Sequence, residues 1–315
     1  MRVFKSLEAA IAERALVGAA MALGNFDGVH VGHRALLARA RRSKLSAALT
    51  FDPHPGKVLS PELAPKLIST TARKLELLEA TGLDALVVHP FSTQFARVTA
   101  DEFEDLLFRR LLVSEVVVGT DFTYGQKRAG TVKSLQAAAA ACDASVFAQE
   151  PVRVDGVVAS SSTIRTYLLE GRVEAAARFL GRPFDLDGVV VPGDGRGRTI
   201  GFPTANVDTD NELRPAAGVY AVALHDAAGV VRGGAANIGV KPTFGGGALT
   251  IEVHLFDFSG DLYGQKIRVQ FLGRIRDERR FASVDELKVQ INRDVESARE
   301  TWARLAATVS GALPR

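Results

Sequence analysis

The spacing of apolar residues changes near residue 183, and this change constrains the fold more than any other feature of the chain. Before it, short apolar runs alternate with stretches of helical spacing, which is typical of buried parallel strands covered by helices. After it, glycine-punctuated segments alternate apolar and polar residues, as antiparallel strands do. A chain of 315 residues has room for two domains. We therefore predict an α/β domain over 1–183 and a β domain over 184–315.

The first region predicts a doubly wound, Rossmann-like sheet. A capping box from Thr99 to Glu102 predicts a helix through Phe103–Leu112. The alanine run Ala137–Ala141 favours another helix, because alanine has the highest helix propensity. The remaining predicted elements are strands at Ala19–Leu23, Ala47–Phe51, Ala85–Val88 and Val116–Val118, and helices at Arg34–Arg42 and Arg73–Ala80.

The second region predicts a small antiparallel barrel followed by one helix. Ser283–Glu286 is a second capping box, and the apolar residues after it keep helical spacing as far as Trp302. We expect the Trp302 ring to pack in the hydrophobic core that this helix covers. The predicted strands are Tyr220–Leu224, Val230–Arg232, Ile251–Phe256 and Ile267–Phe271.

Composition excludes several classes of protein. Hydrophobic residues make up 47% and charged residues 24%, with a mean hydropathy of +0.08, so the chain can fill ordinary cores and is not disordered. The net charge is only +3, from 39 basic and 36 acidic residues, which does not favour nucleic-acid binding. No apolar run reaches the ~18 to 20 residues of a membrane span. We expect a soluble protein without a nucleic-acid or membrane partner.

Two further features of the sequence concern the cellular compartment of the protein. The run Ala15–Gly24 is as long as the core of a signal peptide, but Glu8 and Glu13 precede it, and a core strand is the preferred interpretation. Cys142 is the only cysteine, which excludes an intrachain disulfide and a multi-cysteine metal site. The single cysteine favours the reducing cytoplasm.

A first motif whose residues could bind a ligand or act in catalysis occupies positions 24–33, with the sequence Gly-Asn-Phe-Asp-Gly-Val-His-Val-Gly-His. It follows a predicted strand and precedes a predicted helix, which is where open α/β sheets bind ligands. His30 and His33 can both face a phosphate at the helix N-terminus, because Gly32 leaves space between them. The pair could instead bind a metal or fill a surface turn.

A second motif, Ser-Ser-Ser-Thr-Ile-Arg at positions 160–165, also marks the start of a helix. Its hydroxyls, its free amides and Arg165 can hold phosphate, although a capped helix with a solvated arginine is the plainer interpretation. Together the two motifs suit in-line attack on the α-phosphate of a nucleotide.

These two motifs resemble the His-x-Gly-His nucleotidyltransferases, specifically the flavin adenylyltransferase half of prokaryotic bifunctional riboflavin kinase/FAD synthetases. The resemblance implies that His30 and His33 stabilise the reacting α-phosphate and that Arg165 acts with them. It also implies ATP contacts from Gly24, Asn25, Phe26, Asp27, Gly32, Ser161 and Ser162.

The segment 119–125 resembles the substrate-side loop of the same family. This likeness implies that Asp121 and Phe122 lie near the flavin or the nucleotide. The family pattern leads us to expect a basic residue at Thr123 and a phenylalanine at Tyr124, so the chain departs from it twice.

A glycine-rich loop follows a strand-like run in the second region. Gly193, Gly195 and Gly197 let backbone amides approach a phosphate, although the stretch matches neither common nucleotide fingerprint and could be a flexible barrel loop. Thr204 and Asn206 follow closely, and their oxygens suit a hard cation such as Mg²⁺.

The strand Ile251–Phe256 places Glu252 and His254 on one face, where the carboxylate could accept a hydroxyl proton. An exposed strand glutamate is ordinarily only solvated. However, residues 201–206, 237–244 and 252–258 together resemble the riboflavin kinase module. The resemblance implies Thr204 and Asn206 at MgATP, Glu252 as base for the riboflavin 5′-hydroxyl, and Arg276 near the flavin, with His254 a strand residue only.

The resulting hypothesis is an ATP-dependent enzyme that makes FMN from riboflavin in its barrel and FAD from FMN in its first domain. Riboflavin, FMN, FAD and ATP are its substrates and products, and Mg²⁺ is its cofactor. Two alternatives are a nucleotidyltransferase acting on another phosphate, with the barrel as an accessory, and a non-enzymatic flavin or nucleic-acid binder. The absence of an aromatic-interleaved basic stretch speaks against the binder.

Overall fold

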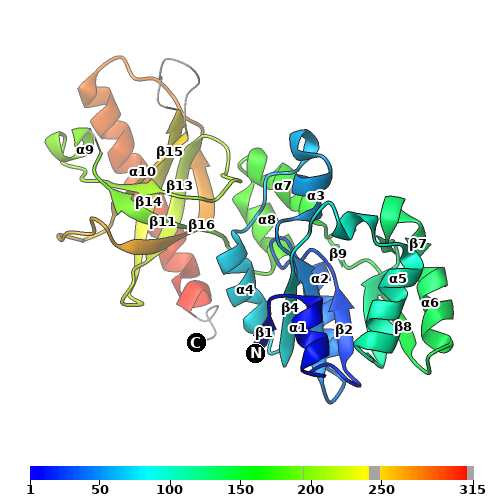
Figure 1. Cartoon of the computed structure of the whole chain (residues 1–315). Coiled ribbons are helices and arrows are strands. Elements are labelled where there is room, and N and C mark those ends of the chain that lie inside the picture. Colours follow the sequence, from blue (N-terminus) through cyan, green and yellow to red (C-terminus); the bar gives the residue numbers. More distant parts are fainter. Residues whose placement is uncertain (194, 241–248, 311–315) are drawn as a thin grey trace. The chain divides into compact units, whose positions relative to one another are not determined.

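The computed structural model describes residues 1–193, 195–240 and 249–310, which form two compact units (Figure 1). The first unit comprises residues 1–66 and 71–160, and the second comprises residues 67–70 and the chain from 161 onward. Helices α7 (Ser161–Leu169) and α8 (Val173–Leu180) therefore group with the barrel. The domain boundary at residue 183 stays a prediction.

The first unit contains a six-stranded parallel sheet with the strand order β1-β4-β3-β2-β5-β8. Its strands are β1 (Arg2–Phe4), β2 (Ala20–Leu23), β3 (Ser46–Phe51), β4 (Ala85–His89), β5 (Glu115–Gly119) and β8 (Ser145–Gln149). The four predicted strands are confirmed. The two that were not predicted are the edge strands, which are partly exposed and so lack a fully apolar pattern.

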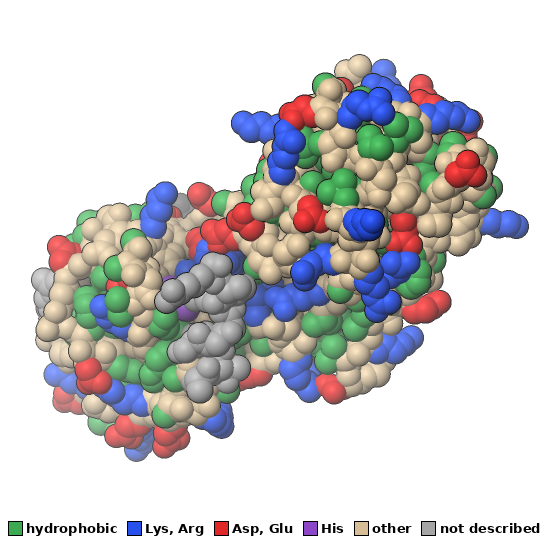
Figure 2. All heavy atoms as spheres, turned by 90° about the horizontal axis from the view of Figure 1, so that it is seen from below, with side chains coloured by type: hydrophobic (Ala, Val, Ile, Leu, Met, Phe, Trp, Pro, Cys, Tyr) green, Lys and Arg blue, Asp and Glu red, His purple; other side chains and the backbone are tan. Residues whose placement is uncertain are grey.

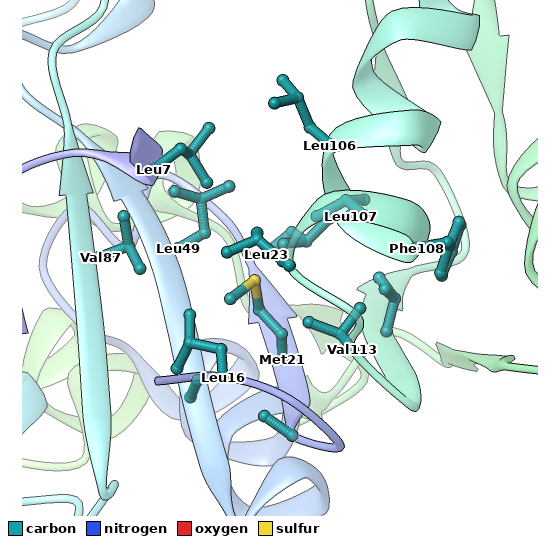
Figure 3. Packing of buried hydrophobic residues seen from close by; sticks show 14 of the residues in the cluster. Leu7, Leu16, Met21, Leu23, Leu49, Val87, Leu106, Leu107, Phe108 and Val113 are labelled. Carbon is teal, nitrogen blue, oxygen red and sulfur yellow. The ribbon is translucent and has the colours of Figure 1, made fainter. Parts of the chain in front are cut away.

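Helices cover both faces of this sheet, as the doubly wound prediction requires. On one face, Met21 and Leu23 pack under α1 (Leu7–Ala12), α5 (Ala100–Asp105) and the π-helical turn Leu106–Arg110, as Figure 3 shows. On the other, Ala20 and Ala22 pack under α2 (Val31–Ala40) and α4 (Thr71–Glu79). The predicted run Ala15–Gly24 thus contains a central core strand.

The connectivity of the sheet determines where a ligand can bind. The chain passes from β2 to its neighbour β3 and later returns to β5 on the other side of β2. Ligands of open α/β sheets bind at such a switch point, beyond the carboxyl ends of the strands. The loop after β2, which carries the first motif, lies at that point.

The remaining helices of the first unit follow the predictions with one change. The Thr99 capping box is present, but the helix after it converts at Leu106 to a π-helical turn. The alanine run lies in α6 (Val132–Ala140), and its predicted helix is confirmed. Shorter elements are α3 (Pro55–Leu59), β6 (Thr123–Tyr124), β7 (Gly130–Thr131), β9 (Arg153–Val154) and β10 (Val157–Val158).

The second unit is built on a closed antiparallel barrel with the order β11-β12-β15-β14-β13-β16. Its strands are β11 (Phe184–Val191), β12 (Ala205–Asp208), β13 (Gly218–His225), β14 (Val231–Val240), β15 (Leu249–Leu255) and β16 (Lys266–Arg276). The predicted barrel is confirmed, and β11 and β12 are added to the four predicted strands.

Helix α10 (Val284–Ser310) packs on the outside of the barrel, and Trp302 packs against its core cluster as predicted. A Cβ at Gly233 would lie 2.6 Å from the Trp302 ring, so β14 needs a glycine there. The second capping box differs in one bond: Ser283 accepts from Glu286 N–H, but the Glu286 carboxylate accepts from Ala282 N–H.

Among the described residues, none of the helices is long and apolar enough to cross a membrane. Acidic and basic side chains are interspersed over the face shown in Figure 2.

Candidate active sites

His30 is both a candidate site residue and the N-cap of α2. Its Nδ1 accepts hydrogen bonds from the backbone N–H groups of Gly32 at 3.1 Å and His33 at 3.3 Å. A Cβ at position 32 would lie 3.0 Å from His30 Cε1 and 3.2 Å from the Ala159 carbonyl oxygen. The glycine of the motif therefore lets the cap and the Ala159 carbonyl approach closely, which gives its spacing a local structural cause.

The two imidazoles are stacked, with ring centroids 3.6 Å apart and planes inclined by 22°. Since His30 Nδ1 accepts two hydrogen bonds, a neutral His30 carries its proton on Nε2. Burial, together with the charges of His30 and Lys74, holds the pKa of His33 well below its usual range. His33 Nδ1 is buried without a hydrogen-bond partner among the described residues, which also favours a proton on Nε2. Both rings are thus prepared to donate from Nε2.

The loop before these histidines has an unusual backbone. Phe26 and Val29 both have positive φ, of 52° and 40°, and Val29 is β-branched and fully buried. This conformation buries Asp27 as well and places the Phe26 ring edge-on to His33, at 5.3 Å between centroids. Gly24 and Asn25 are at the end of β2, before this turn.

Lys74, which belongs to neither sequence motif, is buried on α4 beside this loop. Its ammonium group interacts electrostatically with Asp27 and Asp52, although burial has the larger effect and lowers the pKa of Lys74. The residue sits in an ordinary helical pattern, so no motif marks it.

The second phosphate motif lies at the start of α7, with Ser161 and Ser162 in the first turn and Arg165 one turn later. These residues belong to the second compact unit, whereas the histidines belong to the first. Ala159, two residues before Ser161, belongs to the first unit and approaches Gly32.

The predicted flavin loop follows β5. Asp121 is exposed, and Phe122 is half-buried and stacks on Tyr124, with ring centroids 5.7 Å apart. The two departures from the family pattern have structural partners. Arg128 Nε donates to the Thr123 hydroxyl at 2.8 Å, which brings a guanidinium to the position where a basic side chain was expected. The Tyr124 hydroxyl donates to Glu104 and lies 3.0 Å from Ser134 Oγ.

An aromatic cluster that was not predicted lies at the carboxyl ends of β3 and β4. Phe51 contacts three other rings, with centroid distances of 5.5 to 6.5 Å, and these rings belong to His89, Phe91 and Phe95. An open cavity of about 690 Å³ adjoins the cluster and is lined in part by His89, Phe95 and Arg110. The aromatic residues are spread over 45 positions of sequence, so no contiguous motif reveals the cluster.

In the second unit, the glycine loop folds against the residues predicted to bind MgATP. A Cβ at Gly193 would lie 2.0 Å from the Asn206 side-chain nitrogen, and a Cβ at Gly197 would lie 3.3 Å from Thr204 Oγ1. Gly195 has a φ of +69°, which suits glycine. A Cβ at Gly197 would also lie 2.3 Å from the Phe202 carbonyl oxygen, so the loop has no room for a side chain at positions 193 and 197.

Glu252 lies in a row of side chains that crosses three neighbouring strands. It is opposite Asn206 of β12 on one side and opposite Asn237 of β14 on the other. Residues opposite each other in a sheet project to the same face, with Cβ atoms about 5 Å apart. The predicted base and the predicted metal ligand are therefore neighbours, and Asn237 joins them. Residues 241–244 of the predicted motif 237–244 lie outside the described residues.

His254 does more than occupy a strand position. Its Nδ1 lies 2.9 Å from the carbonyl oxygen of Pro203, and its ring meets Phe202 edge-on at 5.6 Å. Because a carbonyl only accepts, His254 Nδ1 carries a proton and donates it. This bond ties the segment before Thr204 to β15.

Arg276 lies on β16 opposite Val219, which in turn is opposite Asn237. Its guanidinium donates to the buried carboxylate of Asp294 on α10, with distances of 2.7 to 3.0 Å, and to the Asp277 carbonyl. The side chain is thus fixed at the end of the Glu252 row, and its contact with flavin stays a prediction.

Comparison with known proteins matches each half of the chain to one family. Residues 12–163 match the FAD synthetase family and residues 180–302 match the riboflavin kinase family. The bifunctional riboflavin kinase/FMN adenylyltransferase of Haemophilus influenzae is 39% identical over 294 residues, covering 91% of this chain and 96% of that protein. The protein of the same name from Escherichia coli K12 is 40% identical over 289 residues, covering 90% and 92%.

A crystal structure titled macrolide-efflux protein, from Streptococcus pneumoniae, has the same fold over nearly the whole chain. Its TM-score is 0.84 at 33% sequence identity, and the match covers 94% of this chain and 98% of that one.

Proposed function

The chain belongs to the family of bifunctional riboflavin kinase/FMN adenylyltransferases, and from this premise we propose which residues carry out each of its two reactions. The enzyme phosphorylates riboflavin to FMN with ATP and then transfers AMP from a second ATP to FMN, which yields FAD and pyrophosphate. Flavin is substrate and product in this chemistry.

Adenylyl transfer is assigned to the loop after β2. An FMN phosphate oxygen attacks the α-phosphorus of ATP, the new P–O bond forms, and the bond to the β-phosphate breaks to release pyrophosphate. Negative charge develops on the α-phosphate oxygens, where the Nε2–H groups of His30 and His33 are placed to donate. The stacked pair of imidazoles, with His30 held through its Nδ1 by two backbone N–H groups, is the single observation that carries this assignment.

The remaining ATP contacts are assigned from the sequence. Ser161, Ser162 and Arg165 would hold ATP phosphates from the start of α7. Asp121 and Phe122 would contact the flavin. The aromatic cluster of Phe51, His89, Phe91 and Phe95 offers a stacking surface near the same edge of the sheet.

Riboflavin phosphorylation is assigned to the row of Asn206, Glu252 and Asn237. Glu252 accepts the proton of the 5′-hydroxyl while that oxygen attacks the γ-phosphorus, and ADP leaves. The glycine loop from Gly193 to Gly197 supplies backbone amides for the ATP phosphates. Arg276 is assigned to the flavin side of this site.

Mg²⁺ fits the donor set in this unit. A hydroxyl, an amide oxygen and a carboxylate come from Thr204, Asn206 and Glu252, and hard oxygen ligands are what Mg²⁺ prefers. Thr204 and Asn206 would hold the ion, which when bound neutralises charge on the ATP phosphates. The single cysteine supports a cytoplasmic location.

One experiment tests the whole assignment. The full-length protein is incubated with riboflavin and ATP, with Mg²⁺ or with a chelator, and the flavins are separated by chromatography. We expect FMN followed by FAD in the presence of Mg²⁺ and neither in its absence. If FMN formed at the parent rate in the chelator, the metal assignment would be wrong.

A further inference from the structure

We propose that Lys74 is a positioning residue for adenylyl transfer, which fixes the His30–His33 loop through Thr50 and places a cation beside the two histidines. The proposal rests on the assignment of His30 and His33 to this reaction. It concerns a residue outside both sequence motifs, on a helix that contributes no other site residue.

The first support is the burial of a lysine at this edge of the sheet. Lys74 is 8% exposed on α4, and lysine is almost never buried unless it is paired. Its Nζ donates to Thr50 Oγ1 at 3.3 Å and to the Phe51 carbonyl at 3.1 Å. Both acceptors are at the carboxyl end of β3, next to the strand that carries the motif loop.

The second support is the link from Lys74 to that loop. Thr50 is fully buried, and its hydroxyl accepts from Lys74 and donates to the Asn25 carbonyl at 3.0 Å. A hydroxyl can play both parts at once because it has one proton and two lone pairs. The chain of bonds from Lys74 through Thr50 to Asn25 therefore joins α4, β3 and the loop after β2.

The third support is the distribution of charge. Asp27 is buried in the loop at 4% exposure, and an uncompensated carboxylate there would repel the ATP phosphates. The ammonium of Lys74 interacts with Asp27 and with Asp52, so it offsets this repulsion. With one buried cation near two carboxylates, the negative charge that the ATP phosphates meet falls from two to one.

Lys74 also acts on His33. The titratable groups that act on His33 are His30 at the start of its own helix and Lys74 from α4, and Lys74 in turn faces Asp27 and Asp52. After burial and His30, the charge of Lys74 contributes to the low pKa of His33. A proton on His33 Nδ1 would have no acceptor among the described residues, so a neutral ring keeps its single proton on Nε2.

The test compares three variants of the full-length enzyme. Lys74→Met removes the charge and the donors, Lys74→Arg keeps a cation, and Lys133→Met is the matched control on the exposed surface of α6. FAD formation is measured with FMN and ATP, and FMN formation with riboflavin and ATP. We expect Lys74→Met to lower kcat for FAD formation by about 10- to 100-fold, with a smaller change in KM for ATP, because the phosphate donors are misplaced. FMN formation and the control variant should be unchanged, and Lys74→Arg should recover part of the loss.

A second readout separates positioning from packing. The His33 ring is titrated by nuclear magnetic resonance, and we expect its pKa to rise in Lys74→Met and to stay low in Lys74→Arg. Thr50→Val cuts the link to Asn25 without removing the cation, so it should lower FAD formation by itself. Combined with Lys74→Met it should add little, because both changes break the same chain of bonds.

Several outcomes would overturn the proposal. The first is a Lys74→Met variant with the FAD-forming rate of the control. The second is a His33 pKa that is the same in Lys74→Met and in the parent. The third is strict additivity of the Thr50→Val and Lys74→Met effects. If the Lys74→Met variant does not fold, the Thr50→Val variant tests the proposal by itself. FAD formation at the parent rate in Thr50→Val would overturn the link from Lys74 through Thr50 to Asn25. A failure of the underlying assignment of His30 and His33 to adenylyl transfer would give a different result. In that case the His30→Ala and His33→Ala variants would retain FAD formation.

Discussion

The two predicted sites bring reactive groups together in different ways. In the first unit, His30 and His33 come from one turn of chain at the end of a parallel strand, and a helix cap fixes their spacing. In the second unit, Asn206, Glu252 and Asn237 come from three different strands and meet only through the register of the barrel. A site at the edge of a parallel sheet is therefore visible as a contiguous motif, whereas a site on a barrel wall is spread along the sequence.

The difference has a physical origin in the two architectures. Parallel strands are buried on both faces, so polar groups can gather only where the strands end. A barrel strand alternates its side chains between core and outside, so a polar residue can stand at every second position. The first site consequently depends on local backbone geometry, and the second depends on correct strand pairing.

The largest effect is expected from Glu252→Gln, which keeps the shape of the side chain but removes the proton acceptor. FMN formation should fall by roughly 10² to 10⁴, because general base catalysis contributes that much. FAD formation from added FMN should continue at the parent rate, since the histidine site is unchanged. Parallel assays of both reactions check this, and near-normal kinase turnover would remove Glu252 from the mechanism.

Truncation tests whether the barrel site is independent of the first unit. A fragment that begins at residue 161 should form FMN and unfold cooperatively, since α7 and α8 group with the barrel. A fragment that begins at residue 184 loses the bonds from Arg274 to Glu170 and Glu174 and uncovers apolar residues that pack against α8.

This shorter fragment should be less stable by about 3 to 6 kcal/mol, the equivalent of two buried side chains. Urea unfolding of the two fragments measures the difference. Equal stability would place the domain boundary at residue 183, as the change of sequence pattern predicts.

His30→Ala and His33→Ala should each lower FAD formation about 100-fold or more, the usual cost of losing one donor to the developing charge. His30→Ala also removes the α2 cap, which costs about 1 kcal/mol of stability, whereas His33→Ala does not. Kinetics and thermal unfolding of both variants separate the two effects. A halt of FMN formation in either folded variant would contradict the assignment of the reactions to separate units.

The smallest effect is expected from His254→Phe, which keeps a ring beside Phe202 and removes the donor to Pro203. Thr204 should become less well placed, and FMN formation should fall about tenfold, equivalent to about 1.4 kcal/mol in the barrier. KM for MgATP should rise, while FAD formation stays unchanged. His254→Asn is the control, because its amide can still donate, and equal losses in both variants would leave His254 without a positioning role.

The comparison of the histidine site with the barrel site also explains how much of each site could be predicted from the sequence. The histidine motif was found directly, and so was its place at the start of α2, because both are local properties of consecutive residues. Lys74 was not found, since a lysine at a helical position ordinarily faces solvent and only the packing of α4 on the sheet buries it. Asn237 and the role of His254 needed the barrel register and the path of the 202–204 segment.

The sequence by itself determined the two architectures, the order of the units and the motifs that we assign to the two reactions, because periodicity, capping and turn chemistry act over a few residues. The tertiary structure decided which distant groups meet. It buried Lys74 against Thr50, placed Asn206 and Asn237 on either side of Glu252, and fixed Arg276 on Asp294. Those contacts arise from packing and strand register, which depend on the whole chain and leave no pattern in any one segment.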